Sequence, residues 1–277
     1  MGDDLNSEID AAIAYIQRHL YEPLPLAKLA RHIGYSPFHF TRMFKKRIGL
    51  PPLYYASALR LQKAKDLLLE TSLSIRDVGL EIGQQSLGTF TTRFTDRVGM
   101  SPSHFRHSSE AAGAHLRLLR ELNDWSERRP SLMPHGAIRG TVFTEIPFEG
   151  VILIGLFPKP IPEGLPLYGT LISSSREFWL SDIKPGTYYL MATSVSWGAS
   201  AREFLLPHAT LRTRSREPIV VKPYSSVLEL PVTLHPPLPD DPPILISLPL
   251  LMNRFLNRVS GGRRTTEIPS FAGDGMR

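Results

Sequence analysis

The sequence predicts a multidomain chain in which an all-α domain is followed by a mainly-β domain. Up to about residue 107, apolar residues recur every three or four positions, and this pattern occurs twice. Only six of the 25 prolines lie within residues 1–110, and beyond them apolar residues alternate or form short runs bounded by glycine and proline. The first pattern is typical of amphipathic helices and the second of short strands.

The predicted domains are residues 1–107, a helical connector and linker over 108–135, a β-sandwich-like domain over 136–260, and a disordered tail over 261–277. The connector starts with helical spacing and ends in the charged segment Ser126–Pro130. The tail is rich in glycine and arginine, a composition typical of unstructured termini. With 277 residues, 42% of them hydrophobic, the chain is long enough to bury two cores.

Composition narrows the classes of protein. The chain has no cysteine, which excludes disulfides and thiolate metal sites, and we expect no metal or cofactor. The acidic start of the sequence has no apolar signal region, and no run of about 18 apolar residues occurs, so we expect a cytoplasmic protein without a membrane partner. A net charge of +6 suits a polyanionic partner but is common in other proteins too.

The first element of each repeat is a short helix followed by glycine, at Gly34 and Gly83. Glycine is the residue that most easily takes the left-handed conformation after a helix. Ser74, with Asp77 three residues later, forms a capping box for the second copy. Each copy carries an apolar stripe at helical spacing, made of Leu26, Leu29, Ala30 and Ile33 in the first and of Ile75, Val78, Gly79 and Ile82 in the second.

A second helix follows each glycine turn. The first begins at Ser36-Pro37, a capping residue followed by proline at the first helical position, and the second begins near Ser86. Helix, short glycine turn and helix together make a helix-turn-helix, so the first domain is predicted to be a double helix-turn-helix. The inward residues and the closing glycines are Phe40, Phe44, Ile48 and Gly49 in the first copy, and Phe90, Phe94, Val98 and Gly99 in the second.

One continuous helix is predicted between the copies, from Pro52 to Glu70. At 1.5 Å per residue it would be roughly 28 Å long. A rigid spacer of this length can hold two recognition helices about one DNA turn apart, ~34 Å, so that both enter successive major grooves. The repeat therefore predicts an intramolecular version of a helix-turn-helix dimer.

These motifs resemble the AraC/XylS DNA-binding domain in order and spacing over residues 8–107. The resemblance implies a sequence-specific DNA-binding transcription regulator that reads two successive major-groove segments and is not an enzyme. Its implied partners are double-stranded promoter or operator DNA and RNA polymerase. The matching motifs are Gly34-Tyr-Ser-Pro37, Arg60-Leu-x-x-Ala64, Ser74-Ile-x-Asp-Val78, Phe90-x-x-x-Phe94 and Gly99-x-Ser-Pro102.

In the first copy, the resemblance places the base-reading positions on Phe38, Thr41 and Arg42. Arg42 is expected to bond guanine O6 and N7, and Phe38 or Thr41 to meet a thymine methyl group. His39 lies on the same exposed side. Lys45, Lys46 and Arg47 are interpreted either as phosphate contacts or as a solvated helix end favoured by the helix dipole.

The second copy offers poorer base-reading chemistry. Leu87, Gly88, Thr91 and Thr92 take the corresponding positions, with Arg93 beside them, and Thr92 stands where Arg42 would be matched. The family's usual aromatic after the turn glycine is replaced by Gln84. We therefore expect this helix to anchor the protein on the DNA backbone, through Thr91, Thr92, Arg93 and Arg97.

The second half predicts an antiparallel sandwich of short strands at 138–142, 151–157, 178–191 (two strands around a Pro-Gly turn), 218–221 and 227–234. Over residues 136–236 it resembles the carboxypeptidase regulatory-like or Cna-B (transthyretin-like) sandwich. The resemblance implies an effector or association domain. A small-molecule effector and a second copy of the chain are therefore partner candidates.

Two alternative functions concern the C-terminal half. One gives the C-terminal half a GyrI-like small-molecule-sensing fold, and another makes it a DNA-targeted module with a non-cysteine enzymatic activity. For the latter, Asp182, Glu203, His208 and His235 show no acid/base or metal-ligand spacing, so no catalytic residue is predicted. A nonspecific architectural binder would need a larger basic excess than the +3 of residues 1–110.

Overall fold

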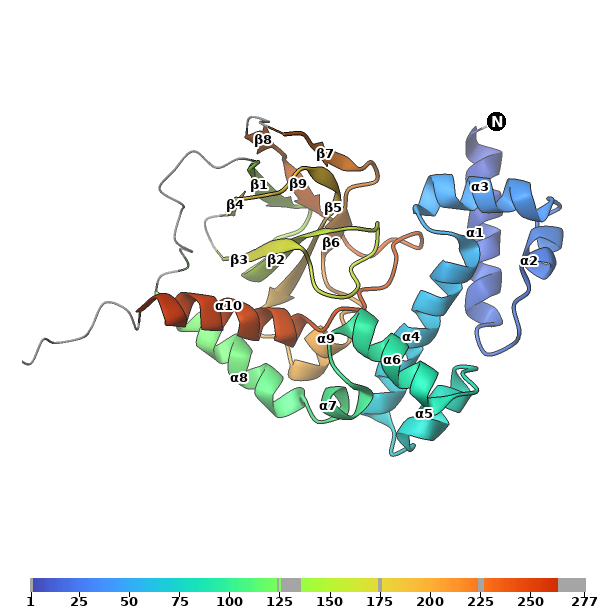
Figure 1. Cartoon of the computed structure of the whole chain (residues 1–277), viewed down its shortest axis with the longest axis horizontal. Coiled ribbons are helices and arrows are strands. Elements are labelled where there is room, and N and C mark those ends of the chain that lie inside the picture. Colours follow the sequence, from blue (N-terminus) through green and yellow to red (C-terminus); the bar gives the residue numbers. More distant parts are fainter. Residues whose placement is uncertain (1, 124, 126–135, 174–175, 224–226, 264–277) are drawn as a thin grey trace, which may run out of the picture.

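The computed structural model describes residues 2–123, 125, 136–173, 176–223 and 227–263. Residues up to Arg106 form a helical region, and the rest of the described chain forms two β-sheets with three more helices (Figure 1). The predicted succession of a helical helix-turn-helix region and a region with β-sheets is confirmed. None of the helices in these ranges is long and apolar enough to cross a bilayer.

The helical region consists of two helix pairs joined by a long helix. Helix α4 spans Pro52–Glu70, as predicted, and contacts elements of both pairs (Figure 1). The other helices are α1 (Gly2–Arg18), α2 (Leu26–His32), α3 (Pro37–Ile48), α5 (Ile75–Glu81), α6 (Leu87–Val98) and α7 (Pro102–Arg106). The predicted helix-turn-helix pairs are thus α2 with α3 and α5 with α6.

Local capping explains where α3 and α6 begin and end. The Ser36 hydroxyl accepts the His39 N–H at 3.3 Å, and the Ser86 hydroxyl accepts the Thr89 N–H at 3.4 Å. Both helices end at a glycine in the left-handed region, Gly49 with φ 84° and Gly99 with φ 87°. Residues other than glycine are strained in this region, so the glycines determine where these two helices end.

The interiors of the two pairs are built alike. Phe40 and Phe44 of α3 and Phe90 and Phe94 of α6 are fully buried. Phe44 meets Tyr55 edge to face at 5.6 Å between ring centroids, and Phe94 meets Phe105 in the same way at 5.7 Å. Edge-to-face pairs of this kind stabilise a core beyond the area that they bury.

The second region contains two sheets that share one buried apolar cluster. One sheet has the order β4-β1-β8, with β9 also on β1, and the other has the order β3-β2-β5-β6, with β7 also on β5. Its strands are β1 (Ile138–Thr144), β2 (Gly150–Phe157), β3 (Tyr168–Ile172), β4 (Glu177–Leu180), β5 (Gly186–Ser196), β6 (Arg212–Arg214), β7 (Ile219–Val221), β8 (Leu228–Glu229) and β9 (Val232–Leu234).

Two expectations for this region are wrong. The sheets are not wholly antiparallel, because β1 pairs in parallel with both β8 and β9. The alternating segment 227–234 is not one strand but two, and Pro231 lies between them. Proline has no N–H to donate to a ladder, so it interrupts the strand that the alternation predicts. Strands β3 and β6 were not predicted.

Three helices accompany the sheets. Helix α8 (Ser109–Arg120), expected as part of a connector, packs against α9 (Ala201–Leu205) and α10 (Leu248–Arg263). Figure 1 shows α10 lying beside α8 at one face of the sheets. Helix α10 was not predicted; Pro249 lies in its first turn, where the missing N–H of proline costs nothing. It continues through 261–263, where the tail was expected to begin; 264–277 and the linker segment 126–135 lie outside the described residues.

Candidate nucleic-acid interface

Helix α3 presents two unengaged side chains to solvent. Phe38 is 80% exposed, although it is a large apolar residue. Arg42 is also exposed, and its guanidinium makes no hydrogen bond or ion pair within the part of the chain that the structure describes. Lys45 and Lys46 are exposed one turn further on. This face can therefore offer an apolar surface and three cations to a partner without breaking contacts within the chain.

The neighbouring candidates His39 and Thr41 are half-buried. The His39 ring lies against Tyr35, with 4.9 Å between ring centroids, and the Thr41 hydroxyl donates to the Pro37 carbonyl at 2.8 Å. The Thr41 methyl group is not used by this hydrogen bond. Both residues thus border the exposed face, with less freedom than Phe38 and Arg42.

Helix α6 presents a plainer surface. Leu87 is 48% exposed, Thr91 is half-buried, and Thr92 and Arg93 are exposed. The guanidinium of Arg93 donates to the Gln84 side chain at 3.2 Å, so the residue that replaces the family's aromatic positions it. Gly88 occupies the place of Phe38 and has no side chain to offer. The exposed side chains of α6 therefore differ from those of α3 at the positions of Phe38 and Arg42.

Arg97 does not lie with these residues, and its predicted DNA contact is not supported. Its side chain is only 12% exposed and pairs with Glu163 at 2.5 Å between Nε and Oε2. A second nitrogen donates to the Ser57 hydroxyl at 3.2 Å, and the guanidinium lies 4.6 Å from the Tyr54 ring centroid. The reason is tertiary: the loop before β3 brings a buried carboxylate to the end of α6.

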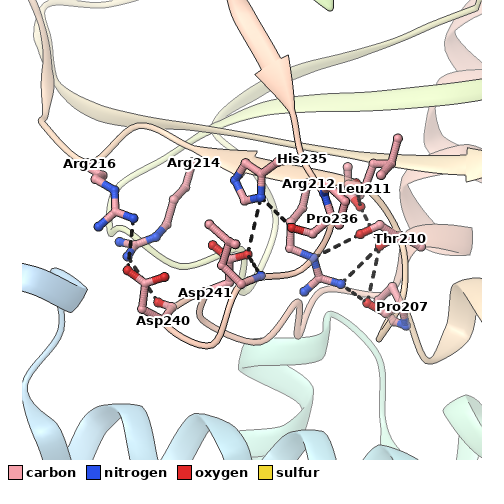
Figure 2. Close-up of polar contacts among 12 residues, drawn as sticks. Pro207, Thr210, Leu211, Arg212, Arg214, Arg216, His235, Pro236, Asp240 and Asp241 are labelled. Carbon is pink, nitrogen blue, oxygen red and sulfur yellow. Dashed lines mark hydrogen bonds and ion pairs between the residues drawn. The ribbon is translucent and has the colours of Figure 1, made fainter. Parts of the chain in front are cut away.

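Arg47, the equivalent residue in the first copy, is engaged in the same manner. It pairs with Asp10 at 2.6 Å and lies 3.9 Å from the Asp240 carboxylate. Asp240 is nearly buried, comes from the segment before α10 and also pairs with Arg216 at 3.0 Å (Figure 2). The two equivalent arginines therefore both meet acidic residues of the second region.

The second region also caps the last carbonyl of each recognition helix. The Arg214 guanidinium donates to the Ile48 carbonyl at 2.7 Å, and the Ser247 N–H donates to the Val98 carbonyl at 3.0 Å. Ile48 and Val98 are equivalent positions of the repeat. Because the C-terminal carbonyls of a helix have no partner within it, these donors both satisfy and hold the helix ends.

Contacts at the closing glycines are equally tight. A Cβ on Gly49 would lie 2.8 Å from the Pro160 ring, and a Cβ on Gly99 would lie 2.7 Å from the Leu250 side chain. Such separations are shorter than normal carbon contacts, so the absence of a side chain permits the approach. The C-terminal ends of α3 and α6 are thus covered, while their N-terminal halves are free.

Lys65 of α4 lies buried in the contact between the regions. It is 1% exposed, and its ammonium donates to the carbonyls of Ile244 at 3.1 Å and Leu245 at 3.3 Å. Burial lowers the pKa of Lys65 to about 7 because the charged form loses its hydration. Nearby, the Asp66 carboxylate contacts His208 at 2.8 Å.

Sequence reasoning missed the residues that hold the two regions together, chiefly Glu163, Arg214, Asp240 and Lys65. Lys65 lies on the apolar face of α4, and a lysine on such a face was a signal that it has a specific partner. The other three lie in loops or a short strand without a pattern. Among the described residues, no three His, Cys, Asp or Glu side chains gather as a metal site would need.

Comparisons with known proteins agree on the helical region. A helix-turn-helix domain family matches residues 29–108. The uncharacterized HTH-type transcriptional regulator YobQ of Bacillus subtilis is 39% identical over 106 residues, which are 38% of this chain and 44% of that protein. The chain thus spans less than half the length of this relative.

A shorter relative is matched over most of its length. The HTH-type transcriptional activator AarP of Providencia stuartii is 33% identical over 103 residues, which cover 37% of this chain and 76% of that protein. A solved AraC-type transcriptional regulator of Chromobacterium violaceum is 29% identical, with coverage of 37% and 92% and a TM-score of 0.36. The extent of the AarP match and the paired helices show that the chain belongs to the AraC-type helix-turn-helix family of DNA-binding transcription regulators.

Proposed function

We propose that α3 and α6 enter two successive major grooves of an operator and that α3 does most of the base reading. The observation that carries this proposal is the free exposure of Phe38 and Arg42 on the N-terminal half of α3. A guanidinium without a competing partner can bond guanine O6 and N7 bidentately. An exposed aromatic ring can pack on a thymine methyl group, and this apolar contact removes part of the ring from water.

Contacts to the sugar-phosphate backbone of DNA come from residues that border these base-reading side chains. Lys45 and Lys46 are exposed and support phosphate binding beside α3. On α6, Thr92 and Arg93 support the same role, and Leu87 and Thr91 add shape. His39 adds shape on α3. Arg47 and Arg97 are left out of the surface because acidic residues of the second region engage both. Phosphate contacts set register without reading sequence.

We further propose that the second region is a sandwich-type effector domain with no enzymatic activity. The cluster of buried residues shared by its two sheets supports this architecture. Its contacts with both helix ends support a role in setting the relation between α3 and α6. In this proposal the DNA-bound chain acts on RNA polymerase at the promoter, and it does so in the cytoplasm.

Sequencing of DNA fragments bound by the full-length chain tests the reader proposal. The expected result is a recurrent site of ~15–20 base pairs with two spaced half-elements, the length of two adjacent grooves. The half-element under α3 should be the better defined, and Arg42→Ala should erase its guanine preference. Bound fragments without any shared element would contradict the proposal.

A further inference from the structure

A cavity of about 750 Å³ lies between the β3-β2-β5-β6 sheet and the segment that leads into α10. Its volume lies in the range of pockets that hold drug-sized ligands. One wall is the sheet face, and the other consists of apolar side chains of the segment and helix, among them Ile244, Ile246, Leu248 and Leu251. None of the residues proposed to contact DNA lines this cavity.

The residues on the floor of the cavity change in character from one edge of the sheet to the other. Residues paired across neighbouring antiparallel strands point to the same face of a sheet, so the register defines two rows that cross all four strands. From β3 to β6 these rows are Leu171, Leu153, Thr193 and Arg212, and Gly169, Gly155, Met191 and Arg214. All eight residues line the cavity. The floor is therefore apolar or bare at β3 and cationic at β6.

The arginines at the cationic end are not equally occupied. Arg212 donates to the carbonyls of Pro207, His208 and Thr210 and is held by its own loop (Figure 2). Arg214 donates to the Ile48 and Asp240 carbonyls, but its Nε is buried without a hydrogen-bond partner among the described residues. A buried donor without an acceptor is costly, so Arg214 is the less completely satisfied of the two arginines.

The helical wall adds to the positive charge. Arg254 and Arg258 of α10 also line the cavity, and Arg254 is exposed. The acidic lining residues are Glu177 and Asp241, and the Asp241 carboxylate already accepts the Leu238 N–H at 2.8 Å. Four arginines thus stand against two carboxylates, which favours an anion over a cation.

We propose that this cavity binds a small organic anion with an apolar body, and that its occupancy is coupled to DNA binding. The apolar body lies over Leu153, Leu171 and Met191, and the anionic group faces the arginines. The coupling rests on the proposed function, since it requires α3 and α6 to read DNA; the binding site itself does not.

The coupling follows from residues that belong to the cavity and to the helix ends at once. Arg214 lines the cavity and caps the Ile48 carbonyl of α3. Ile246 lines the cavity and lies against Gly99 at the end of α6, since a Cβ there would be 3.1 Å from its side chain. The carbonyl of Ile244, a third lining residue, receives the Lys65 ammonium. A ligand that moves this wall therefore acts on both recognition helices.

A pair of fluorescent probes tests the ligand class on the full-length chain. The first is 8-anilinonaphthalene-1-sulfonate, an aromatic body with one anionic group, and the second is N-phenyl-1-naphthylamine, the same body without the sulfonate. We expect the anionic probe to bind saturably at one site, at least about tenfold more tightly than the neutral one, the effect of a single charge-assisted hydrogen bond. Equal affinities would overturn the assignment to anions.

Variants locate the site. Leu251→Trp fills the cavity from α10 and should abolish saturable binding, whereas Asn257→Trp, an exposed position of α10 outside the lining, should leave it unchanged. Arg254→Gln should weaken the anionic probe alone, and Arg117→Gln on α8 serves as its control. Binding that survives Leu251→Trp would overturn the site.

The same probe tests the coupling. DNA affinity is measured by fluorescence anisotropy, with the protein saturated by the anionic probe and then without it. Coupling between two sites changes affinity by about fivefold or more, and reciprocally for the probe. A shift that Leu251→Trp removes supports the proposal, and an unchanged affinity overturns the coupling. If the chain binds no DNA at all, the proposed function fails, while saturable probe binding still establishes the site.

Discussion

Helices α3 and α6 are twelve residues long each, begin at a serine cap and end at a left-handed glycine. Both bury a pair of phenylalanines, and both give their last carbonyl to a donor of the second region. They differ on the N-terminal exposed face, where α3 has Phe38 and Arg42 and α6 has Gly88 and Thr92.

The comparison shows that three parts of each helix are constrained in different ways. Buried positions are alike because each pair must fill the same interior. Helix ends are alike because one partner, the second region, contacts both of them. The exposed face is under neither constraint, so its residues follow what the helix meets outside the chain. The contrast at Phe38 and Gly88 therefore lies outside the interior and the helix ends, and the proposed base reading depends on it.

The largest expected effect tests the likeness of the interiors. Phe44→Ala and Phe94→Ala should each lower the free energy of unfolding by ~3–5 kcal/mol, because both rings are fully buried and lose an edge-to-face partner. Urea unfolding followed by circular dichroism measures the loss. If only one of the two variants is strongly destabilised, the interiors are not equivalent.

The next effect concerns Lys65, which lies between the copies and under the second region. Its pKa is about 7 in the folded chain and rises toward 10.5 on unfolding, so between pH 7 and 9 the unfolded state binds the extra proton. Stability should therefore rise with pH in this window, by ~1.4 kcal/mol per pH unit relative to Lys65→Met.

The control for this prediction is Lys63→Met on the same helix, which should keep the slope of the unchanged protein. Urea unfolding at several pH values provides the measurement, and the slope is read independently of any overall loss of stability. If the stability of the Lys65→Met variant depends on pH in the same way as that of the unchanged protein, the lowered pKa of Lys65 is contradicted.

A smaller effect addresses the exposed faces directly. Arg42→Ala should cost ~1–3 kcal/mol of DNA-binding free energy and relax base preference, because one bidentate base contact is lost. Thr92→Ala, at the equivalent position of α6, should cost less than about 1 kcal/mol, the net value of an ordinary hydrogen bond. Gel shifts on the native operator at fixed salt compare them, and equal losses would remove the asymmetry.

The smallest effect is a gain. Gly88→Ala should stabilise the chain by ~0.5–1 kcal/mol, because alanine has the higher helix propensity. The added Cβ would meet nothing closer than the Ser86 hydroxyl at 3.9 Å. Thermal unfolding checks it, with Gly83→Ala as control: space is open there too, but φ is +78°, so that variant should be destabilised. A loss at Gly88 would mean that α6 requires glycine for another reason.

Much of the helical region was predictable from residues close in sequence. Pro52–Glu70, the caps Ser36 and Ser74, and the glycines after the helices act through bonds within one turn, so their effect is visible in the sequence. The strands were less predictable. Pro231 divided an alternating run, whereas Pro249 lies in the first turn of α10, because proline acts differently at the start of an element and inside it.

Patterns within the sequence therefore account for the double helix-turn-helix, its family and the different exposed residues of α3 and α6. Contacts made on folding turn Arg97 to Glu163, let Arg214 and Ser247 cap both recognition helices, and form the cavity beside them. The two groups of features differ in the sequence separation of the residues involved. Helix caps and apolar periodicity involve residues within a few positions of one another. These contacts join residues 66 to 166 positions apart, and no local sequence pattern indicates which distant residues will pair.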